Sequence, residues 1–323
     1  MKFLKSPEFW YKEPTLVQRL CLKPISEIYR FISNYMYQRP YDVSLSDRKV
    51  IAVGGITAGG SGKTVVVSSI CKILKENGKK VAILSRGYGR ELNKALKVDD
   101  SIHTYKDVGD EPLLLSKQFD VFVGKNRAET ADMASEYEYL VLDDGLSQKY
   151  LAPTKKIVVV DDGQLFGNGE MLPLGPNRLD FEKIKSDIDA VFVLGRGKND
   201  NKILFEGVPT YFGKIIQDFG DISGRLIVFG GLGYPRKFFN IFSNFEVAKA
   251  IIFPDHYPYK ESEIQNLISE AFRLGAQLVT SEKDLMRIPK QYWSQIKTVG
   301  IDVAWESSVD SLLDDSLKPE RIR

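Results

Sequence analysis

Cysteine and histidine are scarce in this chain of 323 residues. It has two cysteines, Cys21 and Cys71, and two histidines, His103 and His256. The cysteines form no CxxC pair and have no metal-ligand spacing, which excludes the common zinc and dithiol motifs and is typical of a reducing compartment. A lone histidine is more often structural than catalytic, so the sequence position of either histidine assigns no role by itself.

The sequence also lacks long apolar runs and a strong net charge. No apolar run reaches the roughly 18 residues that span a bilayer, and acidic residues near the N-terminus argue against a secretory signal. The net charge is only +2, so we expect no nucleic-acid partner. With 43% hydrophobic and 27% charged residues, the composition predicts an ordered globular protein.

Positive charge is concentrated in residues 1–40, which hold seven Lys or Arg and three acidic residues. From Ile25 to Met36, apolar residues recur at helical spacing with polar residues between them, which predicts an amphipathic helix. Pro24 is expected to divide the helical segment. Two interpretations remain open for the apolar stripe. It packs on its own domain, or it enters a lipid surface while basic side chains meet anionic headgroups.

From residue 49 onward, short β-branched runs alternate with helical stretches. The runs at 49–56, 79–89, 119–126, 137–145, 155–163 and 189–197 are largely apolar, as in a parallel sheet covered on both faces. A second set starts near residue 220. We predict an α/β fold of the P-loop NTPase type, with helices on both faces of a mostly parallel sheet, plus a smaller C-terminal α/β domain. The predicted divisions are a lipid-associating helical segment at 1–40, a kinase domain at 41–215 and the smaller domain at 216–323.

The segment "ITAGGSGKT" at 56–64 follows an apolar strand and precedes a helix. In this position, backbone N–H groups and the helix dipole bind phosphate. Lys63 is expected to reach the β- and γ-phosphates of ATP, and Thr64 to ligate Mg²⁺. Thr57 stands where the usual motif has Gly. The predicted nucleotide-binding residues are Thr57, Ala58, Gly59, Gly60, Ser61, Gly62, Lys63 and Thr64.

An apolar strand that ends in two acidic residues, "VLDDG" at 141–145, supports this site. Such a strand supplies the carboxylate that holds Mg²⁺, and Asp143 and Asp144 are both candidates. "VVDDG" at 159–163 has the same pattern, so pattern alone leaves the choice of pair open. The chain has no Asn-Lys-x-Asp motif for reading guanine and no additional Lys at Ala58, and both absences favour a kinase.

Together these motifs resemble the tetraacyldisaccharide 4′-kinases of lipid A biosynthesis, the LpxK family. This family's loop reads Thr-x-Gly-Gly-x-Gly-Lys-Thr, which accounts for Thr57. The resemblance covers roughly residues 8–305 and rests on an ordered series: "ITAGGSGKT", "LSRGYGR" (84–90), "VGDEP" (108–112), "VGKNR" (123–127), "LDDGL" (142–146), "FGNGEMLPLGPNR" (166–178), "FGGLGYPRKFF" (229–239), "FPDHYPY" (253–259) and "TSEKD" (280–284).

The resemblance implies Mg²⁺-dependent transfer of phosphate from ATP to the 4′-hydroxyl of tetraacyldisaccharide 1-phosphate, giving lipid IVA. It implies a peripheral enzyme on the cytoplasmic face of the inner membrane, with a lipid substrate and no obligate protein partner. By the family's pattern, Asp110 acts as general base with assistance from His256. Arg127 matches a phosphate-binding position, and Arg86 and Tyr88 are candidates for contacts to the acceptor.

The chain departs from the family pattern at several positions. Ser147 and Gln148 stand where the family has Gln-His, and Leu179 replaces the Glu that follows the Arg of the Gly-Pro segment. Gly55 stands where Asn is common. Any role of the missing His and Glu must be met differently in this chain.

Two other classes of function share the nucleotide motifs. A soluble P-loop small-molecule kinase or an NTPase with a protein client would turn over nucleotide without lipid. A nucleotide-dependent regulator would bind ATP and leave the acceptor unmodified. The basic N-terminal segment and the ordered series favour the lipid kinase.

Overall fold

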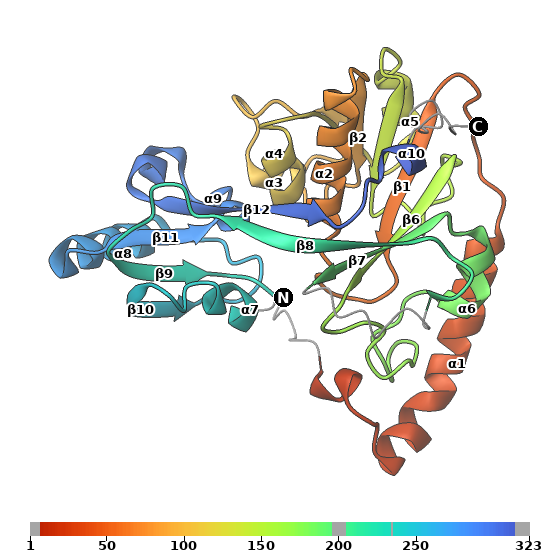
Figure 1. Ribbon diagram of the computed structural model, residues 1–323, viewed down its shortest axis with the longest axis horizontal. Coiled ribbons are helices and arrows are strands. Elements are labelled where there is room, and N and C mark those ends of the chain that lie inside the picture. The colour runs from red at the N-terminus through yellow and green to blue at the C-terminus, as the bar shows by residue number, and fades with distance from the viewer. Residues whose placement is uncertain (1–6, 196–204, 234, 314–323) are drawn as a thin grey trace.

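One mixed sheet runs through the protein. The structure, a computed structural model, describes residues 7–195, 205–233 and 235–313. Its strands are β1 (Lys49–Gly55), β2 (Val81–Ser85), β3 (Leu96–Lys97), β4 (Asp120–Val123), β5 (Tyr139–Asp143), β6 (Lys155–Asp161), β7 (Ala190–Gly195), β8 (Thr210–Asp218), β9 (Arg225–Gly230), β10 (Glu246–Ile252), β11 (Gln277–Ser281) and β12 (Lys297–Trp305). Their order is β10-β9-β11-β12-β8-β7-β6-β1-β5-β2-β4-β3. Figure 1 shows β9, β10 and β11 at one end of the molecule, β1, β2 and β6 at the other, and β8 and β12 running between them.

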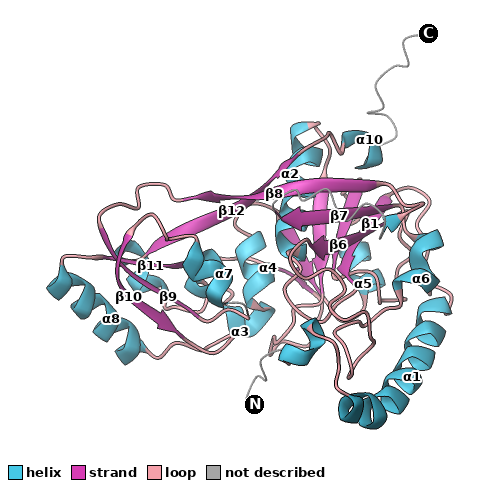
Figure 2. Cartoon of the chain, turned by 60° about the horizontal axis from the view of Figure 1, so that its bottom comes forward, coloured by secondary structure: helices cyan, strands magenta, loops and turns pink. Residues whose placement is uncertain are grey.

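The helices lie on both sides of this sheet (Figure 2). They are α1 (Leu16–Gln38), α2 (Lys63–Glu76), α3 (Tyr105–Val108), α4 (Asp110–Leu115), α5 (Arg127–Met133), α6 (Phe181–Ile184), α7 (Pro235–Asn240), α8 (Glu261–Leu274), α9 (Glu282–Leu285) and α10 (Asp310–Leu313), with short 3₁₀ helices η1 (Glu8–Tyr11), η2 (Lys185–Asp187) and η4 (Lys290–Gln295). Among the described strands, all neighbours are parallel except β3 with β4 and β8 with β12. The predicted α/β class with a mostly parallel sheet is confirmed.

The central strand β1 shows why its sequence is apolar along its length. Ile51 and Val53 point into the core that contains the buried side chains of α2. Val50 and Ala52 point into the core on the opposite face, with side chains of α5 and α6. Because successive residues of a strand face opposite sides, a strand covered on both faces needs apolar residues at every position.

Strand β8 crosses the predicted division at 215/216 and joins the early and late parts of the chain. It pairs in parallel with β7 and antiparallel with β12. Trp305, at the end of β12, donates a hydrogen bond from its indole N–H to Ser69 Oγ of α2 at 2.8 Å. Its ring also packs on Phe192 of β7, with 4.5 Å between centroids. The division into domains at 41–215 and 216–323 stays a prediction.

Helix α1 runs through Pro24, so the expectation that Pro24 divides it was wrong. A proline inside a helix removes one backbone hydrogen bond and bends the helix, and the turns on either side can persist when other contacts hold them. Here a capping box between Thr15 and Gln18 closes the N-terminal end. Figure 2 shows α1 curving along the outside of the molecule.

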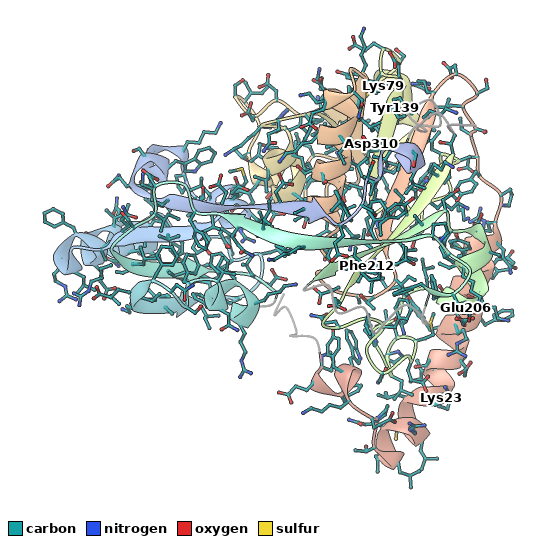
Figure 3. All side chains as sticks on the ribbon, in the orientation of Figure 1. Lys23, Lys79, Tyr139, Glu206, Phe212 and Asp310 are labelled. Carbon is teal, nitrogen blue, oxygen red and sulfur yellow. The ribbon has the colours of Figure 1, made fainter. Side chains whose placement is uncertain are left out.

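The apolar side of α1 faces away from the protein. Ser26 and Ser33 donate hydrogen bonds to the carbonyl oxygens of Met171 and Arg178, at 3.0 and 2.6 Å, so the polar side packs inward. The exposed apolar residues are Leu16, Val17, Leu20, Ile25, Ile28, Phe31, Ile32, Tyr35 and Met36, which we call the outer stripe. In Figure 3, where Lys23 is labelled, side chains of α1 project from the edge of the molecule. The interpretation that the stripe packs on its own domain was therefore wrong.

The outer stripe does not make α1 a membrane-spanning helix. In the ranges that the structure describes, none of the helices combines the length and the hydropathy needed to cross a bilayer.

A matched pair of substitutions tests the core of the late strands. Phe229 of β9 is fully buried, whereas Phe272 of α8 is 88% exposed. We expect Phe229→Ala to lower the free energy of unfolding by about 3–5 kcal/mol, because it leaves a cavity. Phe272→Ala should change it by no more than about 0.5 kcal/mol. Urea unfolding followed by tryptophan fluorescence measures both, and similar effects of the two substitutions would contradict the described burial.

Candidate active site

The phosphate loop lies between β1 and α2, and two of its glycines, Gly59 and Gly62, have a positive φ. Gly62 caps α2 with φ 84°, and a Cβ there would lie 2.5 Å from Leu194 Cδ1. Gly59 also has a positive φ, 137°. A Cβ at Gly55 would lie 2.7 Å from Ser61 Oγ, which explains why this chain has no Asn at position 55. The predicted loop therefore has the backbone conformation of an anion-binding turn at a helix N-terminus.

A second segment holds the start of the loop in an extended conformation. Ala58 N–H donates to the carbonyl oxygen of Pro176, and Arg178 N–H donates to that of Ile56, both at 2.7 Å. Between them, Thr57 and Asn177 form an isolated antiparallel bridge. Extended backbone accepts a β-branched residue, so Thr57 replaces the usual glycine without strain.

Charged groups converge at the end of β5, next to the loop. Lys63 Nζ lies 3.8 Å from Asp144 Oδ1, and Arg178 Nη2 lies 3.2 Å from the same oxygen. Burial raises the pKa of Asp144, but Lys63 and Arg178 outweigh it and the net pKa is lowered. Sequence reasoning assigned no role to Arg178, although its Gly-Pro-Asn-Arg segment belonged to the ordered series.

Asp143 is the buried partner of this acidic pair. Ser85 Oγ donates to its carboxylate at 3.3 Å. Arg127, also buried, donates to the carbonyl oxygens of Asp143 and Gly124, at 3.4 and 2.6 Å. The guanidinium of Arg127 thus stabilises the end of β5 by a hydrogen bond to the main chain of Asp143. The phosphate-binding role of Arg127 stays a prediction. Burial lowers the pKa of Arg127 to about 10 against the opposing charge of Asp143.

The environment of Asp143 fits a divalent cation. Burial, reinforced by the negative charges of Glu111 and Asp144, raises the pKa of Asp143 to about 7. A nearby cation would lower the free-energy cost of ionising Asp143. Mg²⁺ takes oxygen ligands from one or two carboxylates together with substrate phosphates. The described residues contain no group of three or more His, Cys, Asp or Glu side chains placed to hold a metal ion. The donors that fit are Asp143, Asp144 and the hydroxyl of Thr64.

The second acidic pair, Asp161 and Asp162, lies at the end of β6, and Asp161 makes contacts outside the phosphate loop. Asp161 pairs with Lys237 of α7 at 2.5 Å and accepts the N–H of Gly163 at 3.0 Å. Geometry therefore favours Asp143 and Asp144, which face Lys63, over Asp161 and its neighbour.

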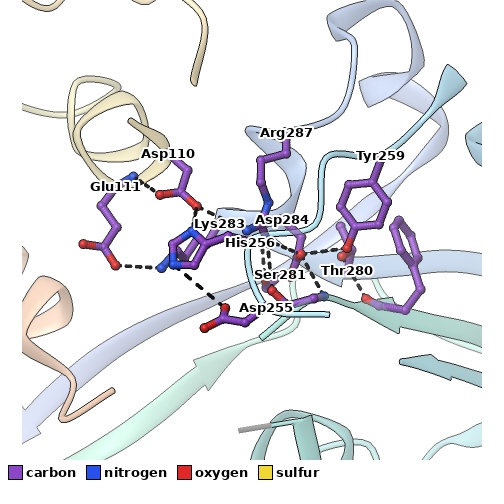
Figure 4. A network of polar contacts seen from close by, with 12 residues as sticks. Asp110, Glu111, Asp255, His256, Tyr259, Thr280, Ser281, Lys283, Asp284 and Arg287 are labelled. Atoms are coloured by element: carbon purple, nitrogen blue, oxygen red, sulfur yellow. Dashed lines mark hydrogen bonds and ion pairs between the residues drawn. The ribbon is translucent and has the colours of Figure 1, made fainter. Parts of the chain in front are cut away.

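Asp110 and His256 are in direct contact although 146 residues separate them. Asp110 begins α4, and its Oδ2 lies 2.9 Å from His256 Nδ1 (Figure 4). Gly109, with φ 96°, positions the start of α4, and His256 itself has φ 54°. Burial raises the pKa of Asp110, but the hydrogen bond from His256 and the charges of Lys283, His256 and Arg287 lower it to about 2. Asp110 is thus a carboxylate at neutral pH.

The loop after β2 connects the two groups of residues. Ser85 at its start contacts Asp143, and the ring of Tyr88 lies 6.2 Å from that of His256. Tyr88 is 71% exposed, and Arg86 is exposed as well. A Cβ at Gly87 would lie 2.7 Å from the carbonyl oxygen of Val108, so glycine allows this loop to approach the segment before α4. The nucleotide loop, the acidic pair and the Asp110–His256 pair therefore belong to one region.

The residues that depart from the family pattern make contacts of their own in the structure. Gln148 forms two hydrogen bonds with the backbone of Leu151, at 2.6 and 2.9 Å, and so closes its own turn. Leu179 is buried, and Asp180 pairs with Arg30 of α1 at 3.6 Å instead of facing the phosphate loop. A cavity of about 330 Å³ lies between α1 and these turns, lined by Tyr29, Ile32, Ser33, Met36, Tyr37, Ser147, Arg178 and Leu179.

A Gly-Lys-Thr loop at the start of α2, with two carboxylates at the end of the adjacent parallel strand β5, defines a P-loop nucleotide-binding protein. Comparisons with known proteins narrow this class. The family model of LpxK, "Tetraacyldisaccharide-1-P 4′-kinase", matches residues 18–318. The chain belongs to the LpxK family, which confirms the resemblance and the predicted kinase class.

Individual relatives align along nearly the whole chain. The tetraacyldisaccharide 4′-kinase of Rhodospirillum rubrum is 35% identical over 328 residues, covering 96% of this chain and 98% of that protein. That of Rhodospirillum centenum is 33% identical over 326 residues, covering 96% of each chain. A crystal structure of LpxK from Aquifex aeolicus in complex with ATP has a TM-score of 0.72 at 26% identity, covering 91% of this chain and 97% of that one.

Two isosteric substitutions should change stability with opposite dependence on pH. The pKa of Asp143 is raised to about 7, so its ionisation destabilises the fold. Without nucleotide or divalent cation, Asp143→Asn should raise the melting temperature above that of the parent at about pH 8. The difference should disappear as the pH falls through about 7 towards 4, where the parent carboxyl is protonated.

Asp110→Asn should change the melting temperature in the opposite direction. Because the pKa of Asp110 is lowered to about 2, its carboxylate stabilises the fold at neutral pH. The variant should melt below the parent at neutral pH, and the deficit should shrink as the pH falls from about 4 to about 2. Scanning calorimetry measures both series, and the same sign for both variants at about pH 8 would contradict the described environments.

Proposed function

We propose that this protein transfers the γ-phosphoryl group of ATP to the 4′-hydroxyl of tetraacyldisaccharide 1-phosphate, giving lipid IVA and ADP. The contact between Asp110 and His256 carries the proposal. It joins an ionised carboxylate to an imidazole, the pair of groups that a site for phosphorylating an alcohol needs as proton acceptor. Membership of the LpxK family supports the choice of substrate.

The donor side of the reaction uses the phosphate loop. Its backbone N–H groups and Lys63 hold the β- and γ-phosphates, and Arg178, beside Asp144, adds positive charge where negative charge develops. Thr64, Asp143 and Asp144 would hold Mg²⁺, which when bound would supply further charge neutralisation on the phosphate oxygens.

The acceptor side uses Asp110 and His256. Asp110 accepts the proton of the 4′-hydroxyl while the sugar oxygen forms a bond to the γ-phosphorus and the bond from that phosphorus to the bridging oxygen breaks. ADP leaves with the electron pair of the broken bond. His256, bonded to Asp110 Oδ2, orients the carboxylate and shares its charge. Exposed Arg86 and Tyr88 stand at the edge of this region, where a sugar or its phosphate can reach them.

The acyl chains of the substrate account for the outer stripe of α1. Its apolar side chains suit the acyl region of a bilayer, and its flanking basic residues suit anionic headgroups. The neighbouring cavity has apolar walls from α1 and one arginine, Arg178. We infer that the enzyme rests on the cytoplasmic face of the inner membrane, with α1 in the interface.

Phosphate transfer from labelled ATP to the purified disaccharide lipid in detergent tests the proposed reaction. Lys63→Ala should abolish product formation, and Asp110→Ala should lower kcat by about 10²–10⁴-fold, because it removes the proton acceptor. Lys249→Ala, which removes a surface lysine paired with Glu270, is the matched control and should retain parental activity. Full activity in Lys63→Ala and Asp110→Ala would contradict the site, and nucleotide turnover without lipid would favour a soluble NTPase.

Membrane docking can be followed from a dye on Cys21. Cys21 is exposed on α1, whereas Cys71 is buried and burial raises the pKa of its thiol, so a maleimide dye labels one site. Vesicles with anionic lipid should shift the dye emission to the blue. Replacing Leu20, Ile28 and Phe31 by Ser should weaken vesicle binding at least about tenfold, because three exposed apolar side chains are lost.

The control for docking is Phe272→Ser on α8, which removes an equally exposed apolar side chain outside α1. It should bind vesicles like the parent. Equal binding by the triple variant and the parent would show that the outer stripe does not meet the membrane.

A further inference from the structure

Arg287 contacts Asp110 from the part of the chain that follows β11. It follows α9, and its side chain is 1% exposed. Its Nη1 lies 3.3 Å from Asp110 Oδ2, and its Nη2 donates to the carbonyl oxygen of Gly231 at 3.1 Å and to Asp284 Oδ1. One planar guanidinium therefore joins the reacting carboxylate to the backbone after β9 and to a second carboxylate (Figure 4).

The second carboxylate, Asp284, is fixed by its own donors. It is fully buried, and it accepts the N–H of Gly231 at 2.9 Å, the hydroxyl of Tyr259 at 2.7 Å and the hydroxyl of Ser281 at 2.5 Å. Three donors therefore hold both carboxylate oxygens of Asp284 before the guanidinium is counted. Asp284 is a rigid support for Arg287.

Asp110 depends on this support for its orientation. From its own helix, Asp110 receives one hydrogen bond, from Glu111 N–H to Oδ1 at 3.0 Å. Its Oδ2 contacts His256 and Arg287, which both come from the part of the chain after β8. Glu111 is in turn paired with Lys283 at 2.7 Å. Without the guanidinium, Oδ2 keeps its contact with His256.

We propose that Arg287 is a positioning residue for phosphoryl transfer, which holds Asp110 in the rotamer that faces His256 and is itself held by Asp284. The proposal rests on the proposed function of Asp110. A buried ion network is weak evidence for stability, because apolar replacements of such networks are often neutral or stabilising. Its location on the reacting carboxylate indicates that this one serves orientation, where a displacement of about 1 Å costs about 10²-fold in rate.

Charge and orientation can be separated, because lysine supplies the charge without the planar fork. Glu111, His256 and Arg287 contact Asp110 directly. The charged groups that pair with these three are Lys283, Asp255 and Asp284. Arg287→Gln removes a positive charge from this set, and Arg287→Lys keeps it. A ranking of parent above Arg287→Lys above Arg287→Gln in kcat is expected if both orientation and charge matter.

The kinetic test is a double-mutant cycle with Asp110, using the full chain, ATP and the disaccharide lipid in detergent. Arg287→Gln should lower kcat about 10²-fold and leave the KM for ATP unchanged. In the Asp110→Asn background, the same substitution should cost less than about twofold, because the guanidinium acts through the carboxylate. Arg273→Gln, an exposed arginine of α8, is the matched control with parental kinetics.

A spectroscopic test uses the two histidines of the chain. In ¹⁵N-labelled protein without substrate, Arg287→Gln should shift the imidazole nitrogen resonances of His256, because Asp110 loses its orientation. Those of His103, whose Nδ1 accepts the N–H of Asp99 at 2.9 Å, should not move. Where Arg287→Gln does not fold, Arg287→Lys replaces it in both tests, since it keeps a buried cation.

The outcomes distinguish this inference from the proposed function. An unchanged kcat in Arg287→Gln, an equal loss in the Asp110→Asn background, or unmoved His256 resonances overturns the positioning role alone, provided that Asp110→Asn lowers kcat itself and keeps a measurable residual activity. Full activity in Asp110→Asn overturns the role of Asp110 as proton acceptor, and the positioning role falls with it.

Discussion

The antiparallel pairing of β8 with β12 is the contact on which the placement of the described residues after 218 depends. β8 already lies parallel to β7, so its free edge decides how the later strands join the sheet. β12 occupies this edge from Gly300 to Trp305, and β11, β9 and β10 follow outward. Trp305 fixes the register by its contacts with α2 and β7. His256 and Arg287 reach Asp110 because this one pairing sets the position of the loops that carry them.

Much of the part of the chain that carries the phosphate loop could be predicted, because neighbouring residues in the sequence indicate its strands and its loop. Continuous apolar runs indicate strands covered on both faces, and the side chains of β1 do enter two cores. The loop at 56–64 is defined by glycines, of which Gly59 and Gly62 have a positive φ, and by a helix that starts at Lys63. Backbone requirements of this kind depend on residues adjacent in the sequence, so the sequence alone can indicate them.

The remaining features depend on contacts between distant residues. Periodicity identified the apolar stripe of α1 but not its direction, which is set by hydrogen bonds from Ser26 and Ser33 to residues about 145 positions away. Arg178 and Arg287 carry no local signal that separates them from surface arginines. Their roles come from what folding places beside them, Asp144 for one and Asp110 for the other. The ordered motif series brought Asp110 and His256 together only through a family resemblance.

The polar side of α1 has a mechanical consequence. It holds the segment from Glu170 to Asp180 through hydrogen bonds and ion pairs, and the same segment is hydrogen-bonded to the phosphate loop and reaches Asp144 through Arg178. These contacts attach α1 rigidly to the segment that holds the phosphate loop. If α1 rests in a bilayer as proposed, its depth and tilt fix the height of the phosphate loop and Asp144 above the headgroup plane, and the sugar of the proposed substrate must rise to that height. Under this proposal, the lateral packing of the surrounding lipids, and not only the chemistry of the substrate, enters the rate of the reaction.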